Sequence, residues 1–291
     1  MGGAVTPSQP MPMPPLLLVD GHNLLWGATF GFPAEIRSRD KARLLIGLFG
    51  FFALLRVAIR DDVAEPPEVI VVFDGQYGGR DRKEIDPTYK AQRPTDEAAL
   101  APIRFLPDVK RGLHARGIAW IEIDHAEADD VIAALVHTTS EPRRVLLMSR
   151  DRDYYQLVTD RVHVLNTRMR SGHRHITPDA VYARHQVTPA QWPDFRALTG
   201  DPADNIPGVR GIGDKTAVQL LDGGLTLDDL PASGRLATGR ARAVREQYDL
   251  ALKWRDMIRL NPDITLPLHP TGYSSALLPR PADVVEELDL W

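Results

Sequence analysis

Nine carboxylates from five stretches of the chain have the residue type and spacing expected of a shared acidic site. They are Asp20, Asp74, Glu127, Asp129, Asp130, Asp151, Asp153, Asp201 and Asp204. Asp20 and Asp74 each end an apolar run, and Asp151 follows a third. Glu127 and Asp130 lie three residues apart, so they share one face of a helix. Each acid alone is explained as a helix cap or a turn residue, but their recurrence favours a common site.

An acidic cluster of this size needs cations, because carboxylates a few ångströms apart repel one another strongly. All-oxygen ligand sets suit Mg²⁺ or Mn²⁺ rather than zinc. Two such ions about 4 Å apart are the usual apparatus for phosphodiester hydrolysis. We expect Asp20, Asp74, Glu127 and Asp129 to build one ion site, and Asp151, Asp153 and Asp201 to build or bridge a second, with Asp130 and Asp204 acting through water.

The elements that must position these acids alternate between short apolar runs and amphipathic segments. Predicted strands cover 16–20, 69–74, 118–123 and 145–149, predicted helices cover 39–60, 107–116 and 126–139, and two short strands are expected at 161–167 and 174–177. This alternation predicts an α/β fold with a mostly parallel central sheet flanked by helices. Because ligands gather at the carboxyl ends of parallel strands, the acids should meet along one edge of that sheet.

Composition limits the class of protein. The 291 residues include no cysteine, which excludes a disulfide scaffold and thiolate chemistry. No apolar run reaches the roughly 18 residues that span a bilayer, and the first residues lack the features of a secretory signal. The net charge is −4, but once the nine site acids are set aside, 30 acidic residues face 35 basic ones. A net acidic chain can therefore still present a basic surface to nucleic acid.

Two further segments suit contact with phosphate. The stretch 75–102 is long for a loop inside a compact domain and is rich in basic residues, which are Arg80, Arg82, Lys83, Lys90 and Arg93. In the stretch 205–221, Gly211 and Gly213 precede a predicted helix whose first turn holds Lys215 and Thr216. Glycines in that place let free backbone N–H groups approach a phosphate. The string resembles a helix–hairpin–helix clasp, which holds duplex backbone without reading bases.

Together these motifs resemble the 5′-nuclease, or flap endonuclease, family, which includes the N-terminal domain of bacterial DNA polymerase I and phage 5′→3′ exonucleases. The matching strings, in family order, are Leu18-Val-Asp-Gly-His-Asn23, Val71-Val-Phe-Asp74, Tyr89-Lys-Ala-Gln-Arg93, Glu127-Ala-Asp-Asp130, Ser149-Arg-Asp-Arg-Asp-Tyr-Tyr-Gln-Leu157 and Thr199-Gly-Asp-Pro-Ala-Asp-Asn-Ile-Pro-Gly-Val-Arg-Gly-Ile-Gly213. They extend over about residues 16–221.

The resemblance implies a two-metal hydrolase that cuts 5′ ends and flaps of branched DNA in replication and repair, with all nine acids as ligands. It implies that Lys90 and Arg93 contact the scissile phosphate, and that residues 75–102 form an arch for single strands, where Arg80, Arg82 and Lys83 would contact DNA. It also implies that Gly211, Gly213, Lys215 and Thr216 bind duplex backbone, and that backbone carbonyls of Val209, Gly211 and Gly213 hold K⁺.

The expected organisation has four parts, which are a flexible leader (1–15), an α/β nuclease core (16–177), a helical DNA-binding region with helices at 178–186, 189–199 and 239–259 (178–260), and an extended segment (261–291). No polymerase follows Trp291, so we expect a stand-alone, monomeric, cytoplasmic and nucleoid-associated nuclease that works with replication or repair proteins such as a DNA polymerase. Two alternatives are a PIN-type ribonuclease, a family with fewer acids and no clasp, and a branched-DNA-binding protein without catalysis.

Overall fold

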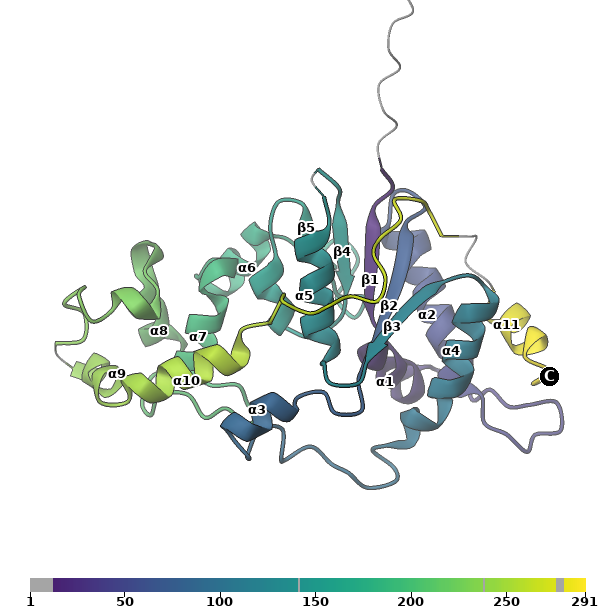
Figure 1. Ribbon diagram of the computed structural model, residues 1–291, viewed down its shortest axis with the longest axis horizontal. Coiled ribbons are helices and arrows are strands. Elements are labelled where there is room, and N and C mark those ends of the chain that lie inside the picture. The colour runs from purple at the N-terminus through teal and green to yellow at the C-terminus, as the bar shows by residue number, and fades with distance from the viewer. Residues whose placement is uncertain (1–12, 141, 238, 276–279) are drawn as a thin grey trace, which may run out of the picture.

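The computed structural model describes residues 13–140, 142–237, 239–275 and 280–291. Its centre is a six-stranded sheet in the order β3-β2-β1-β4-β5-β6 (Figure 1). The strands are β1 (Leu16–Asp20), β2 (Glu68–Asp74), β3 (Ala119–Ile123), β4 (Val145–Met148), β5 (Val162–Leu165) and β6 (His175–Ile176). The first five strands are parallel, and β6 pairs antiparallel with β5. The mostly parallel sheet predicted from the sequence is therefore confirmed.

Both faces of the sheet are covered by helices. Leu17 and Val19 of β1 belong to the core beneath α1 (Gly21–Gly31), α2 (Ile46–Asp62), α4 (Leu106–Ala115) and α11 (Pro281–Glu287). Leu16 and Leu18 belong to the opposite core, which α5 (Ala128–Thr138) and the C-terminal helices complete. Each fully buried aliphatic side chain contributes roughly 1.5–3 kcal/mol, so this alternation fixes the register of the strands.

A helical region extends from the sheet toward the left of Figure 1. It contains α6 (Pro178–His185), α7 (Trp192–Thr199), α8 (Asp214–Leu221), α9 (Arg242–Glu246) and α10 (Tyr248–Ile258), and α7 packs against both α8 and α10. Two backbones meet tightly after α7, because a Cβ on Gly208 would lie 2.3 Å from the backbone nitrogen of Gly200. This close approach, with a φ of 70° at Gly208, holds the loop 201–207 against the end of α7.

Residues 75–102, the expected arch, contain little helix. The segment contains one six-residue helix, α3 (Arg80–Ile85), followed by turns and a 3-10 helix at Ala101–Phe105. Its first half is fixed to the molecule, because Lys90 N donates to Asp204 O at 3.1 Å and Gln92 Nε2 donates to Pro202 O at 2.8 Å. Residues 94–98 are exposed and pass below the sheet toward α4 (Figure 1).

The C-terminal segment is extended only in its first part. Residues 261–275 cross back to the start of β2, where Glu68 accepts hydrogen bonds from the backbone N–H groups of Thr271 and Gly272 at 2.6 and 3.0 Å. Residues 281–287 then form α11, which corrects the prediction of an extended segment up to residue 291. The reason is burial, because Val284 and Val285 are at most 1% exposed against α2 and α4.

Three other boundaries differ from the predictions. Helix α1 was not predicted from the sequence, because its three glycines lower its helix propensity. Helix α2 begins at Ile46 rather than at residue 39, since residues 37–44 fold into a turn closed by a bridge between Arg37 and Leu44. The single helix predicted for 239–259 is divided at Gln247, with a short 3-10 turn and α9 before it and α10 after it. The predicted leader falls outside the described residues except for 13–15.

Candidate active site

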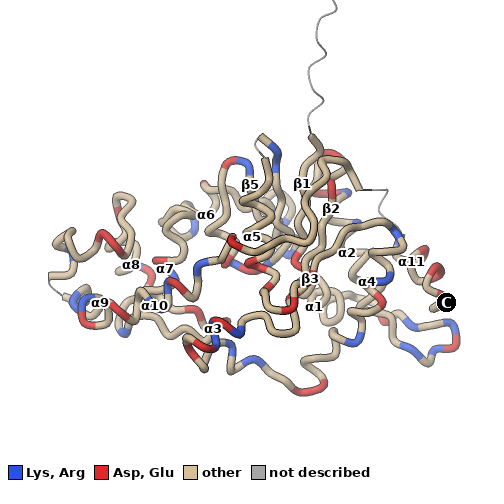
Figure 2. Tube along the Cα trace, in the orientation of Figure 1, with Lys and Arg blue, Asp and Glu red and all other residues tan. Residues whose placement is uncertain are grey.

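The acids gather where the strand order reverses. Successive strands proceed from β1 to β2 and β3 on one side, and from β4 to β5 on the other, so the order reverses between β1 and β4. Ligands of parallel α/β sheets bind at the carboxyl ends of the strands beside such a reversal. Asp20 ends β1, Asp74 ends β2, and Asp151 follows β4. Figure 2 shows acidic positions in the middle of the molecule, between the lower ends of the strands and the C-terminal helices.

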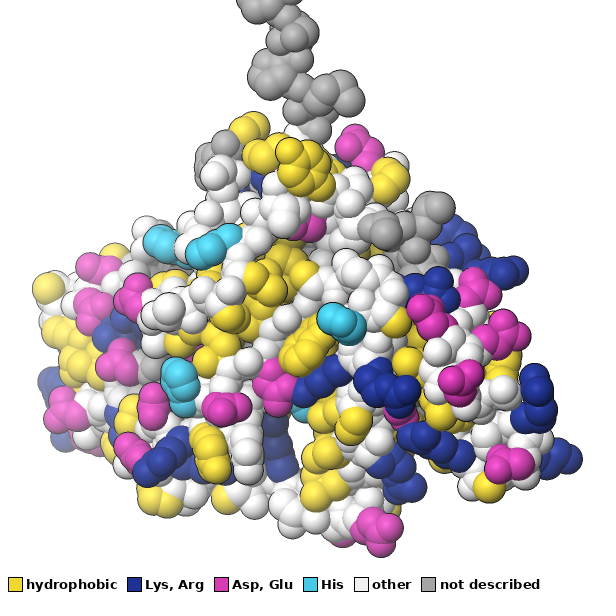
Figure 3. All heavy atoms as spheres, turned by 45° about the vertical axis from the view of Figure 1, so that its right-hand side comes forward, with side chains coloured by type: hydrophobic (Ala, Val, Ile, Leu, Met, Phe, Trp, Pro, Cys, Tyr) yellow, Lys and Arg dark blue, Asp and Glu magenta, His cyan; other side chains and the backbone are white. Residues whose placement is uncertain are grey.

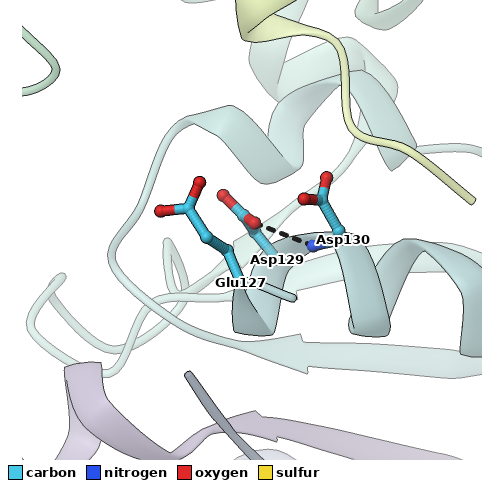
Figure 4. A group of neighbouring side chains, drawn as sticks. All are labelled: Glu127, Asp129 and Asp130. Atoms are coloured by element: carbon cyan, nitrogen blue, oxygen red, sulfur yellow. Dashed lines mark hydrogen bonds between the residues drawn. The ribbon is translucent and has the colours of Figure 1, made fainter. Parts of the chain in front are cut away.

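Electrostatic interactions connect all nine acids. Asp153 interacts with Asp151, Asp204, Asp201 and Asp129, and Asp20 interacts with Asp74 and Asp151. Asp129 interacts in turn with Glu127 and Asp130. The carboxylate oxygens of this last trio lie within 4.8 Å of one another and point to the same side of the first turn of α5 (Figure 4). The structure therefore brings the nine acids together, and their assignment to individual ions stays a prediction.

Arg82 is buried within the acidic cluster, where it contacts two of the acids. Its guanidinium donates to both oxygens of Asp130 at 2.8 Å and to Glu127 at 2.5 Å, and the residue is 9% exposed. It also donates to the carbonyls of Met257 and Arg259 at 2.9 and 3.3 Å. These contacts contradict the prediction that Arg82 binds DNA, because its charge is already paired and lies away from the surface. Arg80 and Lys83, on the same helix, are exposed as DNA contacts would need to be.

Lys90 and Arg93 lie on the acidic side of the segment 75–102. Lys90 Nζ is 2.5 Å from Glu127 Oε1 and 3.8 Å from Asp204 Oδ1. Arg93 Nη2 is 2.9 Å from Asp204 Oδ1, and about half of its side chain, 53%, remains exposed. Burial favours the neutral form of Lys90, but Asp204 and Glu127 outweigh it and raise the pKa of this ammonium group. Lys90 is thus a cation at neutral pH beside the carboxylates.

Three of the acids are compensated less fully than Glu127. Burial raises the pKa of Asp20 to about 7, and the charges of Asp74 and Asp151 contribute to this rise. Burial and then neighbouring carboxylates also raise the pKa values of Asp129 and Asp153 well above the usual range. In contrast, Lys90 and Arg82 overcome burial and lower the pKa of Glu127. Burial and neighbouring carboxylates therefore disfavour the ionised forms of Asp20, Asp129 and Asp153.

Asp153 gives the most direct indication that a cation belongs here. Its Oδ1 is buried and has no hydrogen-bond partner among the described residues, and the whole residue is only 8% exposed. Buried polar atoms are nearly always paired, so an orphaned carboxylate oxygen among four other acids suits a divalent cation with oxygen ligands. The donor set present therefore fits Mg²⁺ or Mn²⁺.

Several residues that orient the acids were not predicted from the sequence. His22 Nδ1 accepts a hydrogen bond from the backbone N–H of Asp74 at 3.0 Å, while Asp74 Oδ1 accepts from the N–H of Ala128 at the start of α5 at 2.8 Å. The Tyr89 hydroxyl donates to Glu127 at 3.1 Å. Arg196 pairs with Asp201 at 2.8 Å. His22 and Tyr89 lie within motifs that the sequence analysis quotes. Their place beside Asp20 and Lys90 in those motifs could have indicated a role near the acids.

The clasp has an open, exposed turn. Gly211 has a φ of +85° and Gly213 caps α8 without a side-chain hydrogen bond; a Cβ on either glycine would meet nothing within 4 Å. Lys215 is exposed and Thr216 is partly exposed. Val209 is buried, and its carbonyl accepts from the N–H of Ile212 at 3.0 Å. The backbone at the start of α8 is therefore accessible to a large partner.

Basic side chains also gather on the outer surface. Figure 3 shows Lys and Arg along the lower half of one face, beside a hollow at its lower edge, with acidic side chains between them. No helix in the described part of the chain is long and apolar enough to cross a membrane.

Comparison with known families accounts for this combination of sheet, acids and clasp. The family model described as 5′-3′ exonuclease, N-terminal resolvase-like domain, matches residues 15–186, and the model described as 5′-3′ exonuclease, C-terminal SAM fold, matches residues 187–277. The chain belongs to the 5′-3′ exonuclease family. This family consists of nucleases, so the resemblance inferred from the motifs is confirmed.

Relatives of this 5′-3′ exonuclease-family chain include much longer proteins. The thermostable DNA polymerase I of Thermus thermophilus is 40% identical over 220 residues, which are 74% of this chain and 25% of the polymerase. The polymerase of Thermus aquaticus is 37% identical over 258 residues, 86% of this chain and 29% of that protein. The chain thus spans about a quarter of the length of these relatives.

Solved structures share the fold. The T5 D15 protein co-crystallised with metal ions is 25% identical with a TM-score of 0.65, over 85% of this chain and 89% of that one. Flap endonuclease-1 from Methanococcus jannaschii has a TM-score of 0.57 at 18% identity, over 95% and 86% of the two chains, and shows the fold alone.

Proposed function

We propose that the protein is a divalent-metal-dependent, structure-specific 5′ nuclease that hydrolyses phosphodiesters at 5′ ends and flaps of branched DNA during replication and repair. The observation that carries this proposal is the buried, unpartnered Oδ1 of Asp153 among four further acids at the carboxyl edge of the sheet. Membership of the 5′-3′ exonuclease family supports the reaction class, and the relative crystallised with metal ions supports the cofactor class.

The residues proposed to hold two or more Mg²⁺ or Mn²⁺ ions are Asp20, Asp74, Asp129, Asp151, Asp153, Asp201 and Asp204. When bound, such ions supply a nucleophilic hydroxide at neutral pH and stabilise charge on the leaving oxygen. Asp130 takes a positioning role, because Arg82 and the backbone N–H of Asn261, at 2.8 Å, occupy its carboxylate. Glu127 acts partly through Lys90, which it holds beside the cluster.

Lys90 and Arg93 are proposed to contact the scissile phosphate. A cation fixed in place beside that phosphate stabilises the charge that develops during hydrolysis without having to reorganise. Lys90 suits this role because Tyr89 and Lys90 both contact Glu127, which fixes the backbone turn before Arg93. Arg93 is half exposed, so it can reach a strand that arrives from solvent.

The helical region is proposed to hold the duplex. Gly211, Gly213, Lys215 and Thr216 offer accessible backbone N–H groups and one exposed cation to phosphates, and Arg80 and Lys83 offer further charge from α3. Backbone carbonyls of Val209, Gly211 and Gly213 are proposed to hold K⁺ in the same turn. We further propose that the protein acts as a monomer in the cytoplasm, close to the nucleoid and to a DNA polymerase.

Incubation with an end-labelled 5′-flap duplex and Mn²⁺, followed by sizing of the products, tests the proposal. The expected result is release of the flap and of short 5′ fragments, lost on chelation. Binding of the flap with no cleavage in any divalent metal would support the alternative of a non-catalytic branched-DNA-binding protein. Cleavage restricted to an RNA strand of the same shape would support the PIN-type ribonuclease. Either result contradicts the proposal.

A further inference from the structure

A cavity of about 250 Å³ lies beside α1, and neither Lys90 nor Arg93 lines it. Helices α1 and α2 and the segments after β4 and β5 form its walls. Its apolar lining includes Leu24, Leu54, Met148 and Leu165, and three arginines also line it, namely Arg150, Arg168 and Arg174. No role in the metal site or in the clasp accounts for these arginines.

Two glycines on α1 make room for two of the arginines. Gly27 and Gly31 are four residues apart, so they lie on one face of the helix. A Cβ on Gly27 would lie 3.3 Å from Nη2 of Arg150, and a Cβ on Gly31 would lie 2.8 Å from Nη2 of Arg168. The two guanidinium groups therefore lie against the backbone of α1. A side chain at Gly27 or Gly31 would occupy the space that they use.

Neither of these two arginines forms an ion pair within the part of the chain that the structure describes. Arg174 forms an ion pair with Asp62 at 2.9 Å, but among the described residues no salt bridge joins Arg150 or Arg168 to a carboxylate. Arg150 instead donates from Nε to the side-chain oxygen of Asn23 and from Nη2 to its carbonyl, both at 3.0 Å.

The cavity is joined to the acidic cluster by hydrogen bonds. Asn23, which holds Arg150, also donates its backbone N–H to Asp20 Oδ1 at 2.9 Å. Ser149, which lines the cavity, donates to Asp20 Oδ2 at 3.0 Å. An anion in the cavity would thus lie next to the proposed reaction centre, because the same two residues contact both places.

We propose that Arg150 and Arg168 form a phosphate-binding site, and that its occupant is a backbone phosphate of the DNA substrate close to the cut. Paired guanidiniums bind phosphate through several directed N–H groups, which suits the fork that each arginine presents. The apolar wall gives the adjoining sugar or base a surface to contact. The inference rests on the proposed nuclease function for the identity of the substrate.

The test compares four proteins, namely the wild type, Arg168→Ala, Gly31→Ala and Arg170→Ala. Gly31→Ala displaces the Arg168 guanidinium without removing its charge, and alanine favours the helix, so the fold survives. Arg170→Ala is the matched control, because Arg170 is an exposed arginine in the same loop that does not line the cavity. Affinity for a fluorescent 5′-flap duplex is measured by anisotropy in Ca²⁺ over a series of NaCl concentrations.

Arg168→Ala and Gly31→Ala should each weaken flap binding about fivefold or more and flatten the log–log salt slope by about 0.9, the contribution of one neutralised phosphate. Arg170→Ala should change the slope by less than half as much. Equal effects in all three variants, or none in the first two, overturn the inference. Inorganic phosphate and thymidine monophosphate are titrated in parallel, and a saturable Arg168-dependent site for the free nucleotide that flap DNA does not displace also overturns it.

This design distinguishes failure of the phosphate-binding site from failure of the nuclease function. If the wild type cuts the flap and neither Arg168→Ala nor Gly31→Ala changes the affinity for it, the phosphate-binding site is wrong and the nuclease function is not affected. A wild type that neither binds nor cuts DNA overturns both.

Discussion

Removal of the Arg82 charge should destabilise the protein severely. Arg82 forms three hydrogen bonds to Glu127 and Asp130 and two to backbone carbonyls, and the side chains involved are almost fully buried. Breaking a buried ion pair from one side costs about 3–5 kcal/mol, because the other charge is left uncompensated. The Arg82→Met protein should therefore lose that amount of unfolding free energy, or roughly 6–20 °C in Tm.

Urea denaturation in EDTA measures this effect without contributions from bound metal. Lys83→Met is the matched control, since Lys83 is exposed on the same short helix and its replacement should change stability by less than about 0.5 kcal/mol. Adding Asp130→Asn to Arg82→Met should recover part of the loss, because the amide needs no cation. If Arg82→Met keeps wild-type stability and loses only DNA affinity, then Arg82 is a DNA contact and its structural role is wrong.

Three further predictions concern catalysis, duplex binding and pH. Lys90→Ala should lower single-turnover flap cleavage by about 100-fold while affinity changes much less, whereas equal losses would indicate plain electrostatic attraction. Lys215→Ala should flatten the salt slope of binding to any duplex sequence by about 0.9, and an unchanged slope would leave the clasp without support. Burial lowers the pKa of His185 to about 4. The unfolded chain therefore binds more protons between pH 6.5 and pH 4, and stability should fall by about 1–3 kcal/mol as pH drops through this window, allowing for partial exposure of the ring. Denaturation of His185→Gln over the same pH range should show a smaller fall, and an identical fall would contradict the assignment.

The acids were predictable because their placement follows from local pattern and one topological rule. Apolar runs that end in Asp20 and Asp74 define parallel strands, and parallel strands must end at the same edge. The first turn of a helix after β3 then brings Glu127 and Asp129 to that edge. No information about distant contacts was needed for this step.

The residues that hold the acids in place were not predictable in the same way. Arg82 reaches Glu127 across 45 positions and the carbonyl of Met257 across 175, and nothing near Arg82 in sequence distinguishes it from Arg80 or Lys83. The C-terminal helix α11 is likewise fixed by burial of Val284 and Val285 against α2 and α4, which lie far earlier in the chain. Packing between distant segments overrides local propensity in such places.

Single-turnover cleavage of a 5′-flap duplex at saturating Mn²⁺, by the wild type and by Asp153→Asn, decides whether the acidic cluster is a divalent-metal nuclease centre. The substitution keeps the shape of the side chain and removes the charge of the buried carboxylate that has no protein partner for Oδ1. We expect the variant to fold, to bind the flap as the wild type does, and to cut it about 100-fold more slowly or worse. Cleavage by Asp153→Asn at the wild-type rate would contradict the claim that these acids form a divalent-metal nuclease centre.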